Sequence, residues 1–262
     1  MDTTPEPSEA VGPLDTVDLE DRVKAIYEQV ADYPFQEFHF ETGRSLAERL
    51  GYPRDGLDRI PEEAVDSFAG VGYFHDLADL KPGERVLDLG SGSGTDSFLA
   101  ALAVRPGLVV GIDMTRAQIA KARRLAHDRG NVEFREGHIE EPSVEDGSID
   151  CVISNGVINL VPDKGRVFAV AARALRPGGR LAIADIVTDA EMPETVTCDA
   201  SLWAACIGGA MQRGLFVETI EEAGFHIETI RPNEAYQFLS RRAQKATAKY
   251  GVTSISLLAR KA

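Results

Sequence analysis

From residue 85 onward, short apolar runs alternate with segments whose apolar residues recur every three or four positions. Runs of the first kind are typical of buried strands, and segments of the second kind are typical of amphipathic helices. The expected strands are 86–89, 108–113, 132–135, 149–154 and 180–187. The expected helices between them are 95–104, 116–127 and 163–175. Because parallel strands need a crossover connection, this alternation predicts a mainly parallel sheet with helices on both faces.

The order changes after residue 187. The later elements are expected to be helices at about 202–211, 216–223 and 236–250, and strands at 225–230 and 252–259. Two late strands suit a sheet that closes with an antiparallel hairpin at its edge. The predicted fold class is therefore α/β and Rossmann-like, with a seven-stranded, mainly parallel sheet and an antiparallel C-terminal edge strand.

The first 80 residues do not follow this alternation. Residues 1–17 are acidic and Pro-rich, which predicts a disordered tail. Residues 18–80 predict a helical N-terminal extension or lid over the following α/β domain, which spans residues 81–262. The helices expected in the extension are 18–31, 42–50 and 61–68. Within the domain, an insertion at about 190–215 is expected to shape a substrate site.

Charge and cysteine content narrow the function classes. The formal net charge is −14, which argues against nucleic acid as a partner because phosphates would be repelled. Three cysteines without a regular framework indicate a reducing compartment. The chain has no apolar run long enough for a membrane span and no signal-peptide pattern at its N-terminus. We therefore expect a cytoplasmic protein with a small-molecule substrate, no membrane association and no metal site.

The strongest local signal is the stretch 85–95, Arg-Val-Leu-Asp-Leu-Gly-Ser-Gly-Ser-Gly-Thr. It predicts a buried strand, then a turn with Gly90, Gly92 and Gly94, then a helix. A strand, glycine turn and helix in this order cradle nucleotide-like ligands, because glycine lets the backbone approach the ligand closely. The dinucleotide pattern places its third glycine one position later, where this chain has Thr95.

Acidic and polar residues follow the predicted strands. Asp88 lies inside the first strand, where a buried carboxylate needs hydrogen bonds from the glycine turn or a cationic ligand. Asp113 ends the second strand, where a carboxylate can accept both hydroxyls of a ribose. Polar clusters also follow the third and fourth strands, at 136–140 and 154–157. Open α/β sheets bind ligands at these carboxyl ends, so the pattern predicts a nucleoside site.

Four phrases together resemble the class I S-adenosylmethionine-dependent methyltransferases. They are Val86–Gly94, Gly111–Thr115, Ile153–Leu160 and Leu175–Arg180. Within that superfamily the chain is most similar to arsenite methyltransferases, in Asp113-Met-Thr, in Pro162-Asp-Lys and in Tyr250-Gly-Val. The resemblance implies a class I methyltransferase fold and S-adenosylmethionine as the cofactor.

The resemblance also implies roles for individual residues. The methionine part of the cofactor would lie against Asp88, Gly90, Ser91, Gly92 and Gly94. The adenosine part would lie against Asp113, Met114, Ile139 and Glu140, and Asn155 would lie near the sulfonium and the substrate entrance.

The chain departs from the arsenite methyltransferases in the thiolates that bind trivalent arsenic. Val71 stands where the family has the cysteine of Gly-Cys-Gly, and Gly156 stands where a cysteine follows Ser-Asn. Soft thiolates suit a soft metalloid, and the only family thiol position that this chain occupies with a cysteine is Cys206. The expected substrate residues are Cys206, Trp203, Tyr73, Phe74 and Phe38.

The catalytic residues remain open at this stage. A general base is needed only if the acceptor keeps its proton at neutral pH, and the candidates are His75 and His39, with His138 as a third. We predict an enzyme that transfers a methyl group to a small, organic acceptor. The alternatives are a metalloid methyltransferase with a reduced thiol set and, from another class, an NAD-dependent oxidoreductase.

Overall fold

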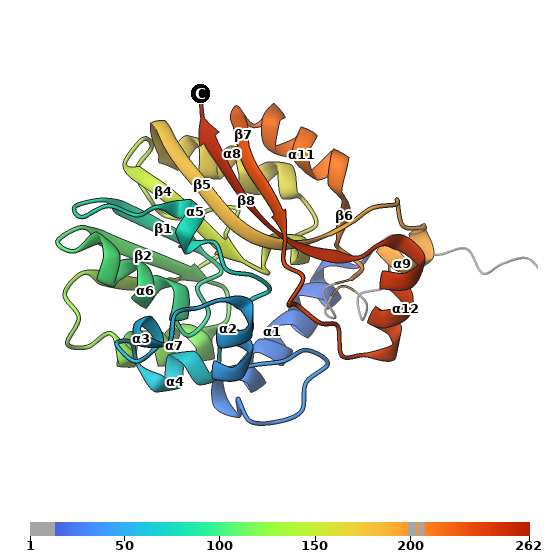
Figure 1. Cartoon of the computed structure of the whole chain (residues 1–262), viewed down its shortest axis with the longest axis horizontal. Coiled ribbons are helices and arrows are strands. Elements are labelled where there is room, and N and C mark those ends of the chain that lie inside the picture. The colour runs from blue at the N-terminus through green and yellow to red at the C-terminus, as the bar shows by residue number, and fades with distance from the viewer. Residues whose placement is uncertain (1–13, 199–202, 204–206) are drawn as a thin grey trace, which may run out of the picture.

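The computed structural model describes residues 14–198, 203 and 207–262 (Figure 1). The strands are β1 Arg85–Leu89, β2 Leu108–Asp113, β3 Val132–Glu136, β4 Ile149–Asn155, β5 Leu175–Thr188, β6 Met211–Gln212, β7 Phe225–Pro232 and β8 Thr253–Lys261. The helices of the α/β domain include α6 Thr95–Val104, α7 Arg116–Leu125, the 3-10 turn η1 Ile158–Leu160, α8 Lys164–Ala174, α9 Glu194–Thr197, α11 Arg213–Glu222 and α12 Arg241–Tyr250. The alternation of strand and helix predicted for residues 85–187 is confirmed.

The strands form one sheet in the order β3-β2-β1-β4-β5-β8-β7. The pairs among β1 to β5 are parallel, whereas β8 is antiparallel to both β5 and β7. The predicted Rossmann-like class and the antiparallel C-terminal strand are confirmed. The outermost place, however, belongs to β7, because β8 lies between β5 and β7. The two-residue β6 adds a short parallel pair with β5 to the seven predicted strands.

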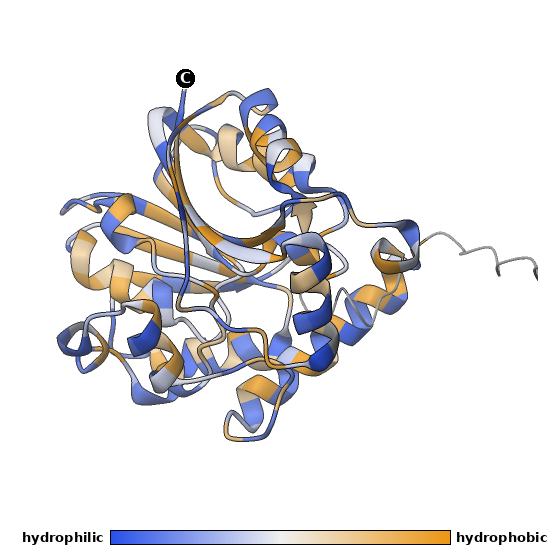
Figure 2. Ribbon diagram, turned by 45° about the vertical axis from the view of Figure 1, so that its right-hand side comes forward, coloured by the Kyte–Doolittle hydropathy of each residue, from blue (hydrophilic) through white to orange (hydrophobic). Residues whose placement is uncertain are grey.

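Helices cover both faces of the sheet. Side chains of β1 alternate between two cores, so that Val86 packs with α6 and α7 while Leu87 packs with α8 and α11. Figure 2 shows apolar central strands between helices whose outer faces are polar. The near-continuous apolar runs of the sequence are explained by this double burial.

The N-terminal extension packs against the first of these faces. Its helices are α1 Thr16–Asp32, α2 Arg44–Leu50, α3 Arg54–Leu57, α4 Glu62–Asp66 and α5 His75–Ala78. The C-terminal half of α1 is fixed to α7, because Gln118 Nε2 donates to the Tyr27 carbonyl at 2.8 Å and Lys121 Nζ donates to the Ala31 carbonyl at 2.8 Å.

Several boundaries differ from the predictions for physical reasons. Helix α1 begins two residues earlier, since Asp15 caps it by accepting hydrogen bonds from two amides of its first turn. Residues 176–179, which lie between the predicted helix 163–175 and the predicted strand 180–187, are part of β5, where the register with β4 shifts. Residues 202 and 204–206 of the predicted helix 202–211 lie outside the described residues. Of the rest, Trp203 is helical, 207–209 form a bend and a turn, and Met211 is in β6. Helix α12 begins at Arg241 rather than at 236, because Ser240 caps it.

The sheet order places a switch point between β1 and β4. The chain moves from β1 to β2 and β3 on one side and from β4 to β5 on the other. Connections therefore leave the carboxyl ends of β1 and β4 in opposite directions and open a crevice there. The structure accordingly brings the glycine turn, Asp113 and Asn155 to one edge of the sheet.

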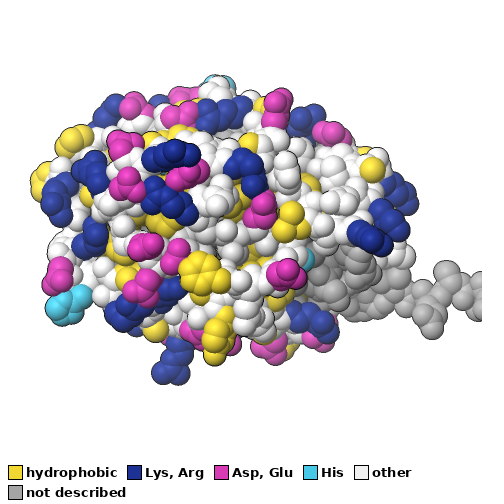
Figure 3. Space-filling view, turned by 60° about the horizontal axis from the view of Figure 1, so that its bottom comes forward, with side chains coloured by type: hydrophobic (Ala, Val, Ile, Leu, Met, Phe, Trp, Pro, Cys, Tyr) yellow, Lys and Arg dark blue, Asp and Glu magenta, His cyan; other side chains and the backbone are white. Residues whose placement is uncertain are grey.

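The surface carries both signs of charge. On the face shown in Figure 3, acidic and basic side chains are interspersed, with some hydrophobic side chains between them. Among the helices that the structure describes, each is too short or too polar to cross a membrane.

Candidate functional site

The glycine turn joins β1 to α6 with an unusual backbone. Gly90, Gly92 and Gly94 have φ of +79°, +52° and +99°, in the region that residues with a Cβ rarely adopt. The Gly90 amide donates to the carbonyl of Ile112 in β2 at 2.8 Å, which fixes the turn against the neighbouring strand. A Cβ at Gly92 would meet nothing closer than Gln118 Oε1 at 3.7 Å, so space remains above this glycine.

Asp113 connects the end of β2 to the glycine turn. Its Oδ2 accepts from the Gly92 amide at 2.9 Å and its Oδ1 accepts from the Thr115 amide at 2.8 Å. Burial raises the pKa of the Asp113 carboxyl, while these amide hydrogen bonds lower it. Two amides occupy about half of the acceptor positions of a carboxylate, which leaves capacity for the ribose hydroxyls.

Asp88 is buried beneath the turn. Its Oδ2 accepts from Ser97 Oγ at 2.5 Å, and its side chain is 2% exposed. Burial raises the pKa of this carboxyl well above its usual value, and the negative charge of Asp96 raises it further. A positive group beside Asp88 would offset both effects.

These residues surround one cavity of about 340 Å³, a volume in the range of small-molecule sites. Its lining includes all the predicted cofactor residues except Gly94: Asp88, Gly90, Ser91, Gly92, Asp113, Met114, Ile139, Glu140 and Asn155. Gly94 instead begins α6, and a Cβ there would lie 2.6 Å from the ring of Phe134. Helix α1 forms one wall of the cavity with Thr16, Leu19, Glu20, Val23 and Tyr27.

The cavity is strongly acidic. The carboxylates in its described lining are Glu20, Asp88, Asp96, Asp113, Glu140 and Asp163. The basic side chains in the same lining are Arg166, which pairs with Glu141, and His138, whose Nε2 lies 3.8 Å from a carboxylate oxygen of Glu20. Such a lining favours a cationic ligand and disfavours an anionic dinucleotide.

Asn155 fixes the loop between α4 and α5. Its Oδ1 accepts from the amides of Val71 at 2.8 Å and Gly72 at 3.3 Å. Its Nδ2 donates to the Gly72 carbonyl at 3.0 Å, so one side chain binds both polar groups of this glycine. The same loop is held from β8, because Ser254 Oγ donates to the Val71 carbonyl at 2.7 Å.

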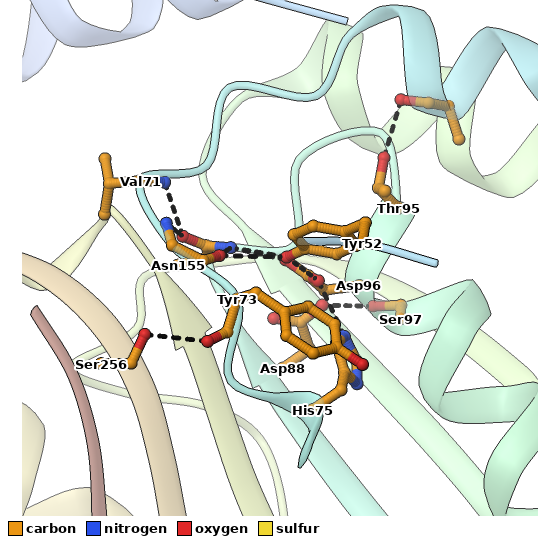
Figure 4. A network of polar contacts seen from close by, with 12 residues as sticks. Tyr52, Val71, Tyr73, His75, Asp88, Thr95, Asp96, Ser97, Asn155 and Ser256 are labelled. Atoms are coloured by element: carbon orange, nitrogen blue, oxygen red, sulfur yellow. Dashed lines mark hydrogen bonds and ion pairs between the residues drawn. The ribbon is translucent and has the colours of Figure 1, made fainter. Parts of the chain in front are cut away.

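Asp96, in the first turn of α6, is the centre of a polar network that sequence reasoning missed (Figure 4). Asp96 Oδ1 accepts from the Tyr52 hydroxyl at 2.6 Å and lies 2.8 Å from His75 Nε2. Asp96 Oδ2 accepts from Asn155 Nδ2 at 3.1 Å. The position of Asp96 just after the glycine turn is a local signal from which a role at the site could have been predicted. Tyr52 lies 44 positions away from Asp96 in the sequence and has no such signal.

The two positions that carry thiols in the resembling family face each other here. A Cβ built on Gly156 would lie 3.0 Å from Cγ1 of Val71. Val71 is 1% exposed, and Gly156 lines the cavity with φ of +71°. The structure therefore brings these positions together as an apolar contact.

The candidate general bases lie in different environments. His75 places Nε2 against Asp96 and does not belong to the described lining of the cavity. His39 packs edge-on against Phe40 with ring centroids 4.6 Å apart, again away from the cavity lining. Their catalytic role stays a prediction.

The predicted substrate residues do not form one cluster in the described part of the chain. Phe38 stacks on Phe40, Phe74 is fully buried, and Tyr73 packs edge-on against Tyr52. Trp203 is buried, and its Nε1 donates to the Thr197 carbonyl at 2.6 Å. Cys206 lies outside the described residues.

The sheet order, the glycine turn and Asp113 together define a Rossmann-like protein with a nucleoside site at the switch point. A family model described as "Methyltransferase domain" matches residues 80–224, which is more than half of the chain. The chain therefore belongs to the class I S-adenosylmethionine-dependent methyltransferases, and S-adenosylmethionine is the cofactor of this family.

The chain is similar in sequence to methyltransferases that are named for different acceptors. An arsenite methyltransferase of Halobacterium salinarum is 45% identical over 204 residues, covering 76% of this chain and 52% of the relative. The nocamycin O-methyltransferase of Saccharothrix syringae is 33% identical and covers 70% of this chain and 75% of its own length. The solved structure of an arsenic(III) S-adenosylmethionine methyltransferase from Chlamydomonas reinhardtii superposes with a TM-score of 0.61 at 30% identity, covering 83% and 73% of the two chains. The chain spans about half the length of the curated arsenite methyltransferases it matches.

Proposed function

We propose that this chain transfers the methyl group of S-adenosylmethionine to a small organic acceptor. The cofactor half of the proposal is carried by the acidic cavity at the switch point. S-adenosylmethionine bears a positive sulfonium and a positive ammonium group, which suit a lining with six carboxylates.

Two further observations fit this ligand. The hydroxyl of Ser91 is buried in the cavity lining and has no hydrogen-bond partner among the described residues, so it is available to a ligand. The space above Gly92 would be filled by any side chain at that position. Both residues belong to the turn expected to hold the methionine part.

The bound cofactor would supply an electrophilic methyl group. The contribution of the chain is then binding and alignment, since a fixed geometry removes much of the entropic cost of the reaction. Asn155 serves this purpose, because its hydrogen bonds to Val71, Gly72 and Asp96 leave the side chain little freedom at the predicted substrate entrance.

The acceptor half of the proposal rests on Val71 and Gly156. Trivalent arsenic needs several thiolates, and these two adjoining positions present a methyl group and a hydrogen instead. Gly156 belongs to the cavity lining and Val71 is buried outside it, so neither position offers a thiolate, which favours an organic acceptor.

A metalloid acceptor is the second candidate, favoured by the arsenite methyltransferases among the relatives. It would depend on Cys198, which is half-buried, and on Cys206. Cys151 is unsuited to this role, because burial in β4 raises the pKa of its thiol to about 12.

The experiment is to incubate the purified chain with methyl-labelled cofactor and either trivalent arsenic with a thiol reductant or a panel of phenols, enols and amines. We expect label in an organic product and none in arsenic. Methylated arsenic that disappears in Cys198→Ser or Cys206→Ser, but persists in the matched control Cys151→Ala, would establish the metalloid reading instead.

A further inference from the structure

Asp96 is placed to do more than hold the fold. It lies in the first turn of α6, its side chain is 8% exposed, and it lines the cofactor cavity together with Asp88. Figure 4 shows Asp96 where side chains of the N-terminal extension, Tyr52 and His75, meet Asn155 from the end of β4.

Three donors fix its carboxylate. Tyr52 and His75 approach Oδ1, and Asn155 donates to Oδ2. A carboxylate offers about four acceptor positions, so one position remains beyond these three contacts from the described residues. Because the partners hold both oxygens, that remaining position has a defined direction.

A pair of buried acids at one site calls for a positive charge. The charge of Asp96 raises the pKa of Asp88, which shows that the two carboxyls lie close enough to repel each other. The hydroxyl donors to this pair, Tyr52 and Ser97, are neutral, and the basic group that contacts it among the described residues is the imidazole of His75. The hydroxyl of Ser91 in the same lining has no partner among the described residues and is available to a ligand.

We propose that Asp96 is a direct ligand of the ammonium group of the cofactor's methionine part, and that Tyr52 and His75 are positioning residues that orient its carboxylate. This inference rests on the proposed function, because it requires S-adenosylmethionine or its demethylated product in the cavity. It makes the N-terminal extension, through Tyr52, a determinant of cofactor specificity.

The test compares two ligands by equilibrium binding. One is S-adenosylhomocysteine, and the other is its deaminated analogue, in which hydrogen replaces the amino group. The unaltered chain should bind the analogue roughly 10- to 100-fold more weakly, the range expected for one charge-assisted hydrogen bond. In Asp96→Asn this ratio should fall to within about threefold, because the deaminated analogue never used the carboxylate.

Asp66→Asn is the matched control, since it makes the same change at a half-buried carboxylate of the N-terminal extension that lies outside the cavity lining. Its ratio between the two ligands should equal that of the unaltered chain. Tyr52→Phe keeps the ring but removes the hydroxyl, so it should lower the ratio partway, and it replaces Asp96→Asn if that variant does not fold. A structural role alone would weaken both ligands equally and leave the ratio unchanged.

The outcomes separate the two proposals. A ratio that stays at its unaltered value in Asp96→Asn or in Tyr52→Phe overturns the role of Asp96, while binding of S-adenosylhomocysteine still supports the proposed function. If the unaltered chain does not bind S-adenosylhomocysteine, both proposals fail.

Discussion

The side chain of Val71 packs against Gly156, and a Cβ at Gly156 would come within 3.0 Å of Cγ1 of Val71. The two residues come from the loop between α4 and α5 and from the end of β4, 85 positions apart. Because neither residue has a thiolate or a polar side chain, the contact offers no ligand to a metalloid.

The double variant Val71→Cys with Gly156→Cys should gain tight binding of trivalent arsenic. The two thiols would stand at adjoining positions, although a side chain at φ of +71° costs about 1–2 kcal/mol. Binding can be followed by the loss of titratable thiols when arsenite is added to the reduced protein. Val71→Cys alone is the control, and equal arsenite affinity in both variants would contradict the inferred contact.

Gly90→Ala and Gly92→Ala should differ in kind. A Cβ at Gly90 would lie 2.3 Å from Val157, so this variant should unfold at a clearly lower temperature. A Cβ at Gly92 would meet only Gln118 Oε1, at an ordinary contact distance of 3.7 Å. Stability should therefore drop by only about 1–2 kcal/mol, the cost of a left-handed backbone, while cofactor binding is lost. Thermal unfolding and calorimetric titration with S-adenosylhomocysteine measure the two effects. If folded Gly92→Ala binds this ligand with unaltered affinity, the cofactor does not lie against the backbone of Gly92.

Asp88→Asn should stabilise the ligand-free chain at neutral pH. Burial raises the folded-state pKa of Asp88 above its unfolded value, so its stabilising contribution is present at low pH and is lost as pH rises through the folded pKa. Asparagine has no such loss. The melting temperature should therefore rise by roughly 2–4 °C for each kcal/mol regained at pH 7.5, with no gain near pH 3. The same variant should bind the cofactor more weakly, and a lower melting temperature at pH 7.5 would contradict the argument.

The titration of Lys164 should be detectable in the fluorescence of Trp203, the only tryptophan of the chain. Its ammonium lies 4.9 Å from the centroid of the indole, and burial lowers the pKa of Lys164 to about 8. Tryptophan emission should therefore shift with a midpoint near pH 8, because loss of the charge changes the field at the ring. Lys164→Met should abolish the shift. A shift that survives in this variant would assign the titration to Asp185, whose pKa burial raises to about 7.

The core of the fold was predictable because its signals are local. The apolar runs that became β1, β2 and β4 are buried on both faces, and the glycine spacing between β1 and α6 requires a turn. The four-residue helices α3 and α5 were missed, since one turn of helix is too short to show a period. Residues 176–179 have the composition of a turn, yet they lie within β5, because Leu175 and Arg180 on either side of them both pair with β4.

That the residues expected at the cofactor would share one cavity was predictable for a similar reason, since they follow directly after successive parallel strands. The contacts of the N-terminal extension with this region were not predictable, because they join distant positions. Nothing near Tyr52 in the sequence indicates a hydrogen bond to Asp96, and nothing near Val71 indicates contact with Gly156. Such pairs depend on how the N-terminal extension packs over the sheet, which the hydrophobic pattern does not specify.

The carboxylates around the cavity also bear on turnover. After methyl transfer the cofactor's sulfur is a neutral thioether, so the spent molecule has lost one of the positive charges that the acidic wall attracts. The carboxylates should therefore contribute more to binding of the sulfonium than to binding of the by-product. Added salt screens them, so it should weaken binding of the fresh cofactor more than binding of the spent one.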